Sequence, residues 1–248
     1  MLRRIAHITD THLDDPTLPE GEGDYPLKNL EAVLEAIAAA GIDEIVHTGD
    51  LGEKETYPYL FQLLRNYNNS VKVIPGNHDQ PTEVMTHFTN PATAGRAELY
   101  YAYEDEHYKY IFMDSSSEII SEPQLEWLTA EAATLRRIIL FIHHPILAVN
   151  TGIDSLYPLH NRDTVNEILQ QCKNTVTVFC GHYHMPDQRT EGRIKQYVTP
   201  AVSFQVKKHS PTIEIRTDSF AFRIITISES EVKTSLMTNH YDGFISKV

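Results

Sequence analysis

Residues that could bind metal ions or transfer protons gather in five short clusters along this chain of 248 residues. The clusters are Asp10-Thr11-His12, Gly49-Asp50, Gly76-Asn77-His78-Asp79, His143-His144-Pro145 and Gly181-His182-Tyr183-His184. A Gly-Asp pair or a loop asparagine taken alone is typical of a turn. Two histidines at positions i and i+2 after a glycine match the reach needed to hold a metal. Five such clusters in one chain therefore predict a metalloenzyme.

The types of donor atom in these clusters narrow the choice of metal. Carboxylate, imidazole and amide oxygen without thiolate suit Mn, Fe, Zn, Co or Ni better than a soft-metal site. The candidate ligands are too many for one ion with an open position, but they are enough for two ions that share a carboxylate. We therefore expect two divalent or mixed-valence transition-metal ions as cofactors.

An apolar run typical of a β-strand precedes each cluster. These runs cover residues 5–9, 42–48, 71–74, 137–142 and 174–180. Apolar residues at helical spacing predict helices over residues 27–37 and 57–67, and Gly41 is placed to end the first of them. The β-α-β-α-β order predicts a parallel sheet with right-handed crossovers. Open α/β sheets place their chemistry at the carboxyl ends of such strands.

The rest of the chain is predicted to be richer in β structure. Two aromatic runs over 99–103 and 108–114 predict an antiparallel hairpin, and Ser121 predicts the start of a helix that ends near residue 135. After a loop over 146–159 and a helix over 163–171, we expect strands over 193–198, 201–206, 212–216, 220–227 and 232–238. With no repeat or linker, the prediction is one α/β domain over residues 1–248, with a second sheet packed on the first.

Composition excludes several classes of function. The formal charge is -13, with 21 Lys and Arg against 34 Asp and Glu, which argues against a broad nucleic-acid groove. The most apolar long run, residues 138–149, is far short of a membrane span. Cys172 and Cys180 occur in a chain with no recognisable signal peptide, so we expect reduced thiols and a cytoplasmic location.

The five clusters, taken in order, resemble the signature of the calcineurin-like metallophosphoesterase superfamily. The matching motifs span Asp10 to His184. This resemblance implies a four-layer α-β-β-α sandwich of two packed mixed β-sheets, with a dimetal site at the carboxyl ends of the central strands. It also implies that one metal is held by Asp10, His12 and His184, that the other is held by Asn77, His143 and His182, and that Asp50 bridges them.

The same resemblance implies the catalytic roles. A metal-bridging hydroxide would attack phosphorus, and His78 would face the phosphate, stabilise its developing charge and protonate the leaving oxygen. An acid three residues after the bridging Asp often orients this histidine, and Glu53 occupies that position. Asp79 is the alternative partner of His78. By resemblance His143 is the ligand, which leaves His144 behind it or facing the substrate.

Secondary stretches indicate a branch of the superfamily. The segments 143–145, 159–163 and 199–205 are similar to class III cyclic-nucleotide phosphodiesterases, so the expected substrate is a small phosphoester such as 3',5'-cyclic AMP. The alternatives are another small ester, such as a glycerophosphodiester or a nucleotide-diphosphate compound, or a non-catalytic scaffold. The loops over 13–26 and 146–159 would decide the substrate, and Arg162 and Tyr183 are candidate pocket residues. We expect a monomer or a homodimer.

Overall fold

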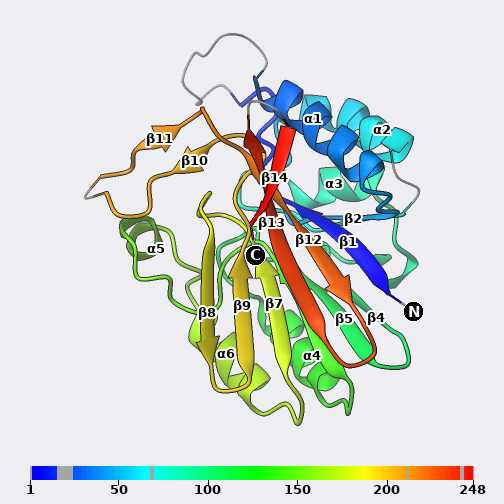
Figure 1. The fold of residues 1–248 in the computed structure, drawn as a ribbon. Coiled ribbons are helices and arrows are strands. Elements are labelled where there is room, and N and C mark those ends of the chain that lie inside the picture. The colour runs from blue at the N-terminus through cyan, green and yellow to red at the C-terminus, as the bar shows by residue number, and fades with distance from the viewer. Residues whose placement is uncertain (1, 16–24, 68–69, 211, 241–242, 248) are drawn as a thin grey trace.

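The computed structural model describes residues 2–15, 25–67, 70–210, 212–240 and 243–247. Two six-stranded mixed sheets form its centre, with the strand orders β14-β13-β12-β1-β2-β3 and β4-β5-β6-β7-β9-β8 (Figure 1). Strands β10 and β11 form a separate two-stranded ribbon.

The strands and helices of both halves of the chain have these bounds. The strands are β1 (Arg3–Ile8), β2 (Glu44–His47), β3 (Ser70–Val73), β4 (Tyr101–Glu104), β5 (Tyr108–Met113), β6 (Arg137–Ile142), β7 (Val176–Cys180), β8 (Asp187–Glu191), β9 (Ile194–Val198), β10 (Gln205–Val206), β11 (Ile215–Arg216), β12 (Ala221–Ile227), β13 (Val232–His240) and β14 (Gly243–Lys247). The α-helices are α1 (Tyr25–Ala39), α2 (Tyr57–Tyr67), α3 (Pro81–His87), α4 (Glu122–Ala132), α5 (Gly152–Leu156) and α6 (Arg162–Gln170).

Alternating side chains on strand β5 show how the layers are held together. Tyr110 and Phe112 are buried in the core that also contains residues of β1, β2, α1 and α2. Their neighbours Ile111 and Met113 are buried in the core beneath α4 and α6. Because successive side chains of a strand point to opposite faces, β5 packs on the other sheet with one face and on helices with the other. The predicted α-β-β-α order is confirmed (Figure 1).

The direction of the strands brings the polar clusters to one edge. Strands β1, β2 and β3 run parallel to one another, and so do β5, β6, β7 and β9. The carboxyl ends of β1, β2, β3, β6 and β7 are the points at which the five clusters leave the sheets. The predicted parallel arrangement is therefore confirmed, as is the antiparallel hairpin of β4 and β5.

The turn of this hairpin is held by one carboxylate. Asp105 accepts hydrogen bonds from the backbone N–H groups of His107 and Tyr108, at 2.9 and 2.8 Å, and from the Tyr110 hydroxyl at 2.9 Å. Burial tends to raise the pKa of Asp105, but these donors outweigh it and lower the pKa below its ordinary value. The ionised carboxylate therefore stabilises the turn.

The strand predicted over residues 201–206 is wrong for most of its length, because only Gln205–Val206 forms a strand. The backbone N–H groups of Val202 and Ser203 donate to the carbonyl oxygens of Thr9 and Asp10, so they are not available to a sheet ladder. The side-chain amide of Asn29 donates hydrogen bonds to the carbonyl oxygens of Val202 and Ser203. This segment therefore ties β1 and α1 together beside the first cluster.

Other differences concern short or polar elements. The loop predicted over 146–159 contains α5, and the strand predicted over 212–216 is reduced to Ile215–Arg216. The sequence analysis did not predict α3, β8 or β14. The loop predicted over 13–26 lies mostly outside the described residues, and α1 already begins at Tyr25.

Two further features concern membrane-spanning helices and the cysteines. None of the helices in the described ranges is long and apolar enough to cross a membrane. Cys172 and Cys180 are both free and buried, which agrees with the expected reduced thiols. The cytoplasmic location and the oligomeric state stay predictions.

Candidate metal centre

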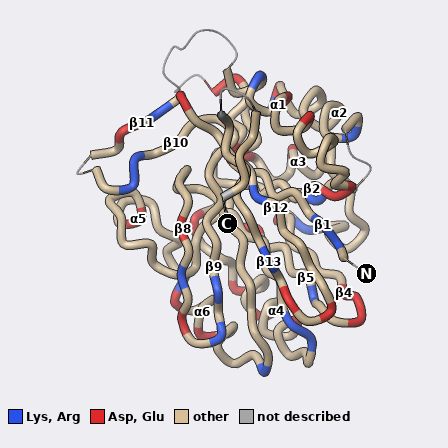
Figure 2. The backbone as a smooth tube through the Cα atoms, viewed as in Figure 1, with Lys and Arg blue, Asp and Glu red and all other residues tan. Residues whose placement is uncertain are grey.

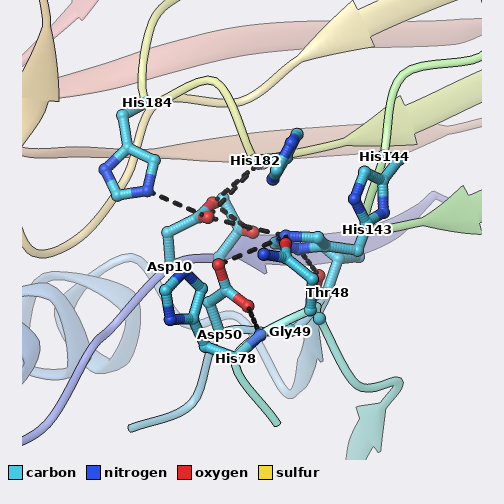
Figure 3. Close-up of polar contacts among 12 residues, drawn as sticks. Asp10, Thr48, Gly49, Asp50, His78, His143, His144, His182 and His184 are labelled. Atoms are coloured by element: carbon cyan, nitrogen blue, oxygen red, sulfur yellow. Dashed lines mark hydrogen bonds and ion pairs between the residues drawn. The ribbon is translucent and has the colours of Figure 1, made fainter. Parts of the chain in front are cut away.

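Five strand ends deliver all seven predicted ligands to one edge of the two sheets. Figure 3 shows Asp10, Asp50, His143, His182 and His184 among them. Asp10 and His12 follow β1, Asp50 follows β2, and Asn77 follows β3. From the second sheet, His143 follows β6, while His182 and His184 follow β7. The centre is thus assembled from both sheets, and its side chains are held by the strands on which they end.

The first group of possible metal ligands consists of Asp10, His12, Asp50 and His184, all buried, with donor atoms within 4.8 Å of one another. The Nε2 atom of His184 lies 3.2 Å from Asp10 Oδ1 and 3.2 Å from His12 Nε2. His12 Nε2 lies 3.5 Å from Asp50 Oδ2. Two carboxylates and two imidazoles therefore point at one small volume.

The second group contains Asp50, His143 and His182, and these residues too are buried and within 4.8 Å of one another at their donor atoms. His143 Nε2 lies 3.3 Å from Asp50 Oδ2 and 3.1 Å from Asn77 Oδ1. The Oδ2 atom of Asp50 thus faces a histidine of each group. The two groups share this carboxylate, which is the arrangement that a pair of cations requires.

Each of the four histidines has one ring nitrogen held by an oxygen atom outside the two groups. Their partners are Asp15 Oδ2 for His12 Nδ1 at 3.0 Å, Thr48 O for His143 Nδ1 at 2.7 Å, Phe204 O for His184 Nδ1 at 3.0 Å, and Tyr157 O for His182 Nε2 at 2.9 Å. Metal-bound histidines usually donate their other N–H group in this way, which fixes the tautomer and the ring orientation. The inward nitrogen of each ring is therefore free to bind a cation, and the donor set fits transition-metal ions.

The backbone around these side chains is unusual. Five of the seven predicted ligands have positive φ angles: Asp10 (55°), His12 (45°), Asp50 (53°), His182 (69°) and His184 (50°). A non-glycine residue in this region costs on the order of 1–3 kcal/mol, and such residues concentrate at functional sites. The turn after β1 is what allows Asp10 and His12, two residues apart, to point the same way.

The loops after β2 and β3 are locked against each other. A Cβ atom added to Gly76 would lie 2.2 Å from Asp50 Oδ1 and 2.8 Å from His143 Cε1, so no side chain fits there. The Asp79 carboxylate accepts hydrogen bonds from the backbone N–H groups of Asp50, Leu51 and Gly76 and from a tyrosine hydroxyl. Asp79 is thus committed to holding the backbone of the loop that carries Asp50.

Charge in the centre favours cations. Burial alone would raise the pKa values of Asp10 and Asp50, but the neighbouring histidines lower both below the ordinary range. Burial also opposes a charge on His143, yet Asp50 and Asp10 outweigh it and raise the pKa of this histidine to about 9, so a cation that binds its Nε2 atom must displace a proton. Both carboxylates are therefore ionised at neutral pH, as metal binding requires.

The environment of His78 differs from that expected. Its side chain is exposed and its ring centroid lies 5.1 Å from that of His12, while its backbone N–H donates to Asp50 Oδ1 at 3.0 Å. Among the described residues, neither Glu53 nor Asp79 hydrogen-bonds to the His78 ring, and Glu53 lies exposed. Their predicted orienting roles are not supported by this geometry.

An acid that sequence reasoning missed lies closer to His78. Asp15, His12 and His78 place one donor atom each within 4.8 Å of one another. The signal available in the sequence was the position of Asp15 three residues after His12, in the loop over 13–26 that we expected to decide the substrate. Asp15 can therefore support both an inner imidazole and the exposed one.

His144 and Tyr183, the neighbours of predicted ligands, lie outside the centre. His144 is fully buried behind His143 and His182, and its Nδ1 atom is 2.9 Å from Ser115 Oγ. The Tyr183 hydroxyl donates to Asp154 Oδ1 at 2.7 Å and does not face the metal groups.

Asp154 organises the loop beside His182. It accepts hydrogen bonds from the backbone N–H groups of Val149 and Asn150 and from the side chains of Arg162 and Tyr183. The same loop contains Tyr157, whose carbonyl oxygen holds His182. Arg162 is thus engaged by Asp154 at the edge of this loop.

Comparisons with known proteins agree with this geometry. A family model described as calcineurin-like phosphoesterase matches residues 3–186. A probable cyclic nucleotide phosphodiesterase of Fibrobacter succinogenes is 27% identical over 240 residues, covering 94% of this chain and 93% of the relative. The 3',5'-cyclic adenosine monophosphate phosphodiesterase CpdA of Escherichia coli is 28% identical over 239 residues, covering 90% of this chain and 85% of the relative.

A solved structure shows the same fold. The crystal structure of a dimetal phosphatase from Danio rerio superimposes with a TM-score of 0.67 at 14% identity, covering 94% of this chain and 98% of that chain. With the family match over residues 3–186 and the two donor groups at the strand ends, the assignment is clear. The chain belongs to the calcineurin-like phosphoesterase family and is a metal-dependent phosphoester hydrolase.

Proposed function

We propose that this protein is a dimetal phosphodiesterase that hydrolyses a small nucleotide such as 3',5'-cyclic AMP. In this proposal one ion is held by Asp10, His12 and His184, and the other by Asn77, His143 and His182. Asp50 bridges the two. The observation that carries the proposal is the position of Asp50 Oδ2, which lies 3.5 Å from His12 Nε2 and 3.3 Å from His143 Nε2.

Two cations bound in this way would supply Lewis-acid stabilisation of the phosphoryl oxygens and activation of water for attack. Asp10 and Asp50 supply the negative charge that holds them, and both are buried and so protected from competing solvent. The hydrogen bonds that His143, His184 and His182 donate to the carbonyl oxygens of Thr48, Phe204 and Tyr157 hold these imidazoles in position.

His78 is the residue that we propose to act on the substrate directly. It is the exposed imidazole beside the inner His12, and its backbone is fixed by the bond to Asp50. From this position the ring can donate a hydrogen bond to a phosphoryl oxygen and a proton to the leaving oxygen. Asp15 lies close enough to orient it.

Two observations support a nucleotide as substrate. The Fibrobacter succinogenes relative is named a probable cyclic nucleotide phosphodiesterase, and the Escherichia coli relative is named a 3',5'-cyclic adenosine monophosphate phosphodiesterase. In addition, the backbone carbonyl oxygen of Tyr157 accepts a hydrogen bond from His182, and Tyr157 is 50% exposed. In this proposal the exposed ring of Tyr157 stacks on the nucleobase, as aromatic residues do when proteins bind single-stranded nucleic acid.

The test is a substrate panel with protein stripped by a chelator and reloaded with Mn, Fe, Zn, Co or Ni. Cyclic AMP, cyclic GMP, bis(p-nitrophenyl) phosphate, p-nitrophenyl phosphate and a glycerophosphodiester are compared by kcat/KM. We expect the cyclic nucleotides to be hydrolysed and the Asn77→Ala variant to be inactive. Asn166→Ala is the matched control, because Asn166 lies on α6 and hydrogen-bonds to Glu191, outside the seven predicted ligands.

The outcomes distinguish the proposed substrate from the proposed diesterase activity. Hydrolysis of bis(p-nitrophenyl) phosphate without hydrolysis of either cyclic nucleotide would reject the substrate and keep the diesterase. Activity only on p-nitrophenyl phosphate would reject the diesterase. Two bound ions with no activity on any of these esters would point to a substrate outside the panel, and the absence of bound metal would favour the scaffold alternative.

A further inference from the structure

A groove of about 780 Å³ lies between the edge strand β8 and strand β13, and its lining begins at Pro186, two residues after His184. Pro186 and the first residues of β8 line one side, and Glu231 with the first residues of β13, up to Leu236, lines the other. Consecutive residues of a strand point to opposite faces, so a groove that touches all of them runs along the strand edge. Strand β9 contributes only Lys195 and Tyr197, two residues apart, and forms the floor with one face.

Half of β13 has an open edge in this groove. On one side β13 pairs with β12 from Val232 to Thr238. On the other side β14 pairs only with the part from Leu236 to His240 (Figure 1). Within the ranges that the structure describes, residues 232–235 therefore have no strand partner on that edge. Their outward N–H and C=O groups form a row that another extended chain could pair with.

The groove is positively charged, although the chain carries a formal charge of -13. Five cationic side chains line it and only two acidic ones, Asp187 and Glu231. Figure 2 shows Lys and Arg positions on both β8 and β9 in this part of the molecule. Arg189 and Lys208 share Asp187, and Lys233 pairs with Glu231. The groove therefore has a local excess of positive charge.

Two of these cations have no carboxylate within ion-pair distance among the described residues. Arg223 is only 4% exposed, and its guanidinium donates to the hydroxyls of Thr199 and Thr234 and to a carbonyl oxygen. Lys195 is exposed and lies over the ring of Tyr197, with its Nζ 5.0 Å from the ring centroid. A buried cation without a counter-ion is costly, and an anionic ligand would offset that cost.

We propose that this groove binds an acidic, extended segment of a partner protein, which adds to the open half of β13 as a strand. The outward backbone groups of residues 232–235 favour a peptide as the ligand, because an added strand binds through main-chain hydrogen bonds. The cations select the side chains, since alternate Asp or Glu residues of an added strand would face Lys195 and Arg223. The four unpaired residues span roughly 13 Å, enough for a short motif.

The test uses full-length, metal-loaded protein and a fluorescein-labelled eight-residue peptide of alternating Val and Glu, followed by fluorescence anisotropy at physiological salt. We expect saturable binding that weakens about tenfold in Lys195→Glu, because the reversal replaces an attraction by a repulsion. Lys28→Glu is the matched control, since Lys28 is exposed on α1 and lines no part of the groove. Phosphodiester hydrolysis by the Lys195→Glu protein reports that it is folded.

Two further peptides separate strand addition from simple charge attraction. A version with Gln in place of Glu, and a version N-methylated on alternate backbone nitrogens, should each bind about tenfold more weakly. Equal binding of the N-methylated peptide would refute the strand-addition mode. The absence of saturable binding by the acidic peptide, or tighter binding of a single-stranded oligonucleotide to the same groove, would overturn the proposal.

Discussion

Replacing Gly181 by alanine tests whether the position of the Asp10 carboxylate matters as much as the proposal requires. Gly181 follows β7 and precedes His182, and its φ angle is not in the left-handed region. An added Cβ atom would lie 2.1 Å from Thr9 Oγ1 and 2.5 Å from Asp10 Oδ2. The substitution therefore acts by steric overlap and not by backbone strain.

The size of the effect follows from these distances. Ordinary contacts of a Cβ atom begin at 3.4 Å, so the two oxygen atoms are too close by about 1 Å. Either the Asp10 carboxylate or the Gly181 loop must move by that amount. A displacement of about 1 Å at a reacting site can lower the rate on the order of 10²-fold. Overpacking of a filled interior typically costs about 1–3 kcal/mol of unfolding free energy.

The assay is kcat/KM for bis(p-nitrophenyl) phosphate, with metal content measured by elemental analysis and folding by thermal denaturation. Gly152→Ala is the matched control, because its φ angle is also ordinary and its Cβ atom would meet only Ser210 O at 4.0 Å. We expect Gly181→Ala to lose about 10²-fold in kcat/KM and part of its metal, and Gly152→Ala to match the wild type. Wild-type metal content and kcat/KM in Gly181→Ala would refute the reasoning.

Three further changes probe residues around the centre. Asp154→Asn removes a carboxylate that holds the loop beside His182, so we expect metal affinity, measured by isothermal titration calorimetry, to fall by about 10-fold or more. His78→Ala should lower kcat by roughly 10²-fold or more while leaving metal content unchanged, because the residue acts on the substrate; His209→Ala, an exposed histidine elsewhere, is its control. Asp105→Asn should lower the urea midpoint near neutral pH, and the difference from wild type should vanish in acid.

The sign of the Asp105 effect follows from its lowered pKa. A carboxylate with a lower pKa in the folded state stabilises the protein above its unfolded pKa, and this contribution disappears as pH falls through the folded pKa. Chelator is included so that metal release does not contribute to the curve. A midpoint difference that stays constant from neutral pH to acid would contradict the assignment. For Asp154, unchanged metal affinity would show that the loop does not position His182.

The sequence predicted most of the elements that carry the site. Strands β1, β2, β6 and β7 are buried on both faces for most of their length, so their apolar runs are easy to recognise. Strand β3 is a half-buried edge strand and was recognised from the short run that ends at Ile74. Strand β8, with the sequence Asp-Gln-Arg-Thr-Glu, lies at a sheet edge and is largely exposed, so it has no apolar signal. The segment 201–204 reads as a strand because it is apolar, yet its backbone is hydrogen-bonded to β1 and α1.

The identity of the predicted ligands came from the sequence, but their orientation did not. The positive φ angles at Asp10 and Asp50 depend on contacts with residues far along the chain, such as the bond from His182 N–H to the Asp10 carboxylate. The acceptors that fix three of the histidines are backbone carbonyl oxygens, which every residue type provides. No pattern of side chains could therefore have indicated them. The exposure of Glu53 was equally hidden, because it depends on how the loop after β2 turns.

The central claim is that two cations are bound on either side of Asp50. The most direct test is anomalous X-ray diffraction from crystals of the Mn²⁺-loaded protein, measured at the manganese absorption edge. We expect two anomalous peaks, one among Asp10, His12 and His184 and one among Asn77, His143 and His182, with the Asp50 carboxylate between them. A single peak, or two peaks that do not share Asp50, would contradict it.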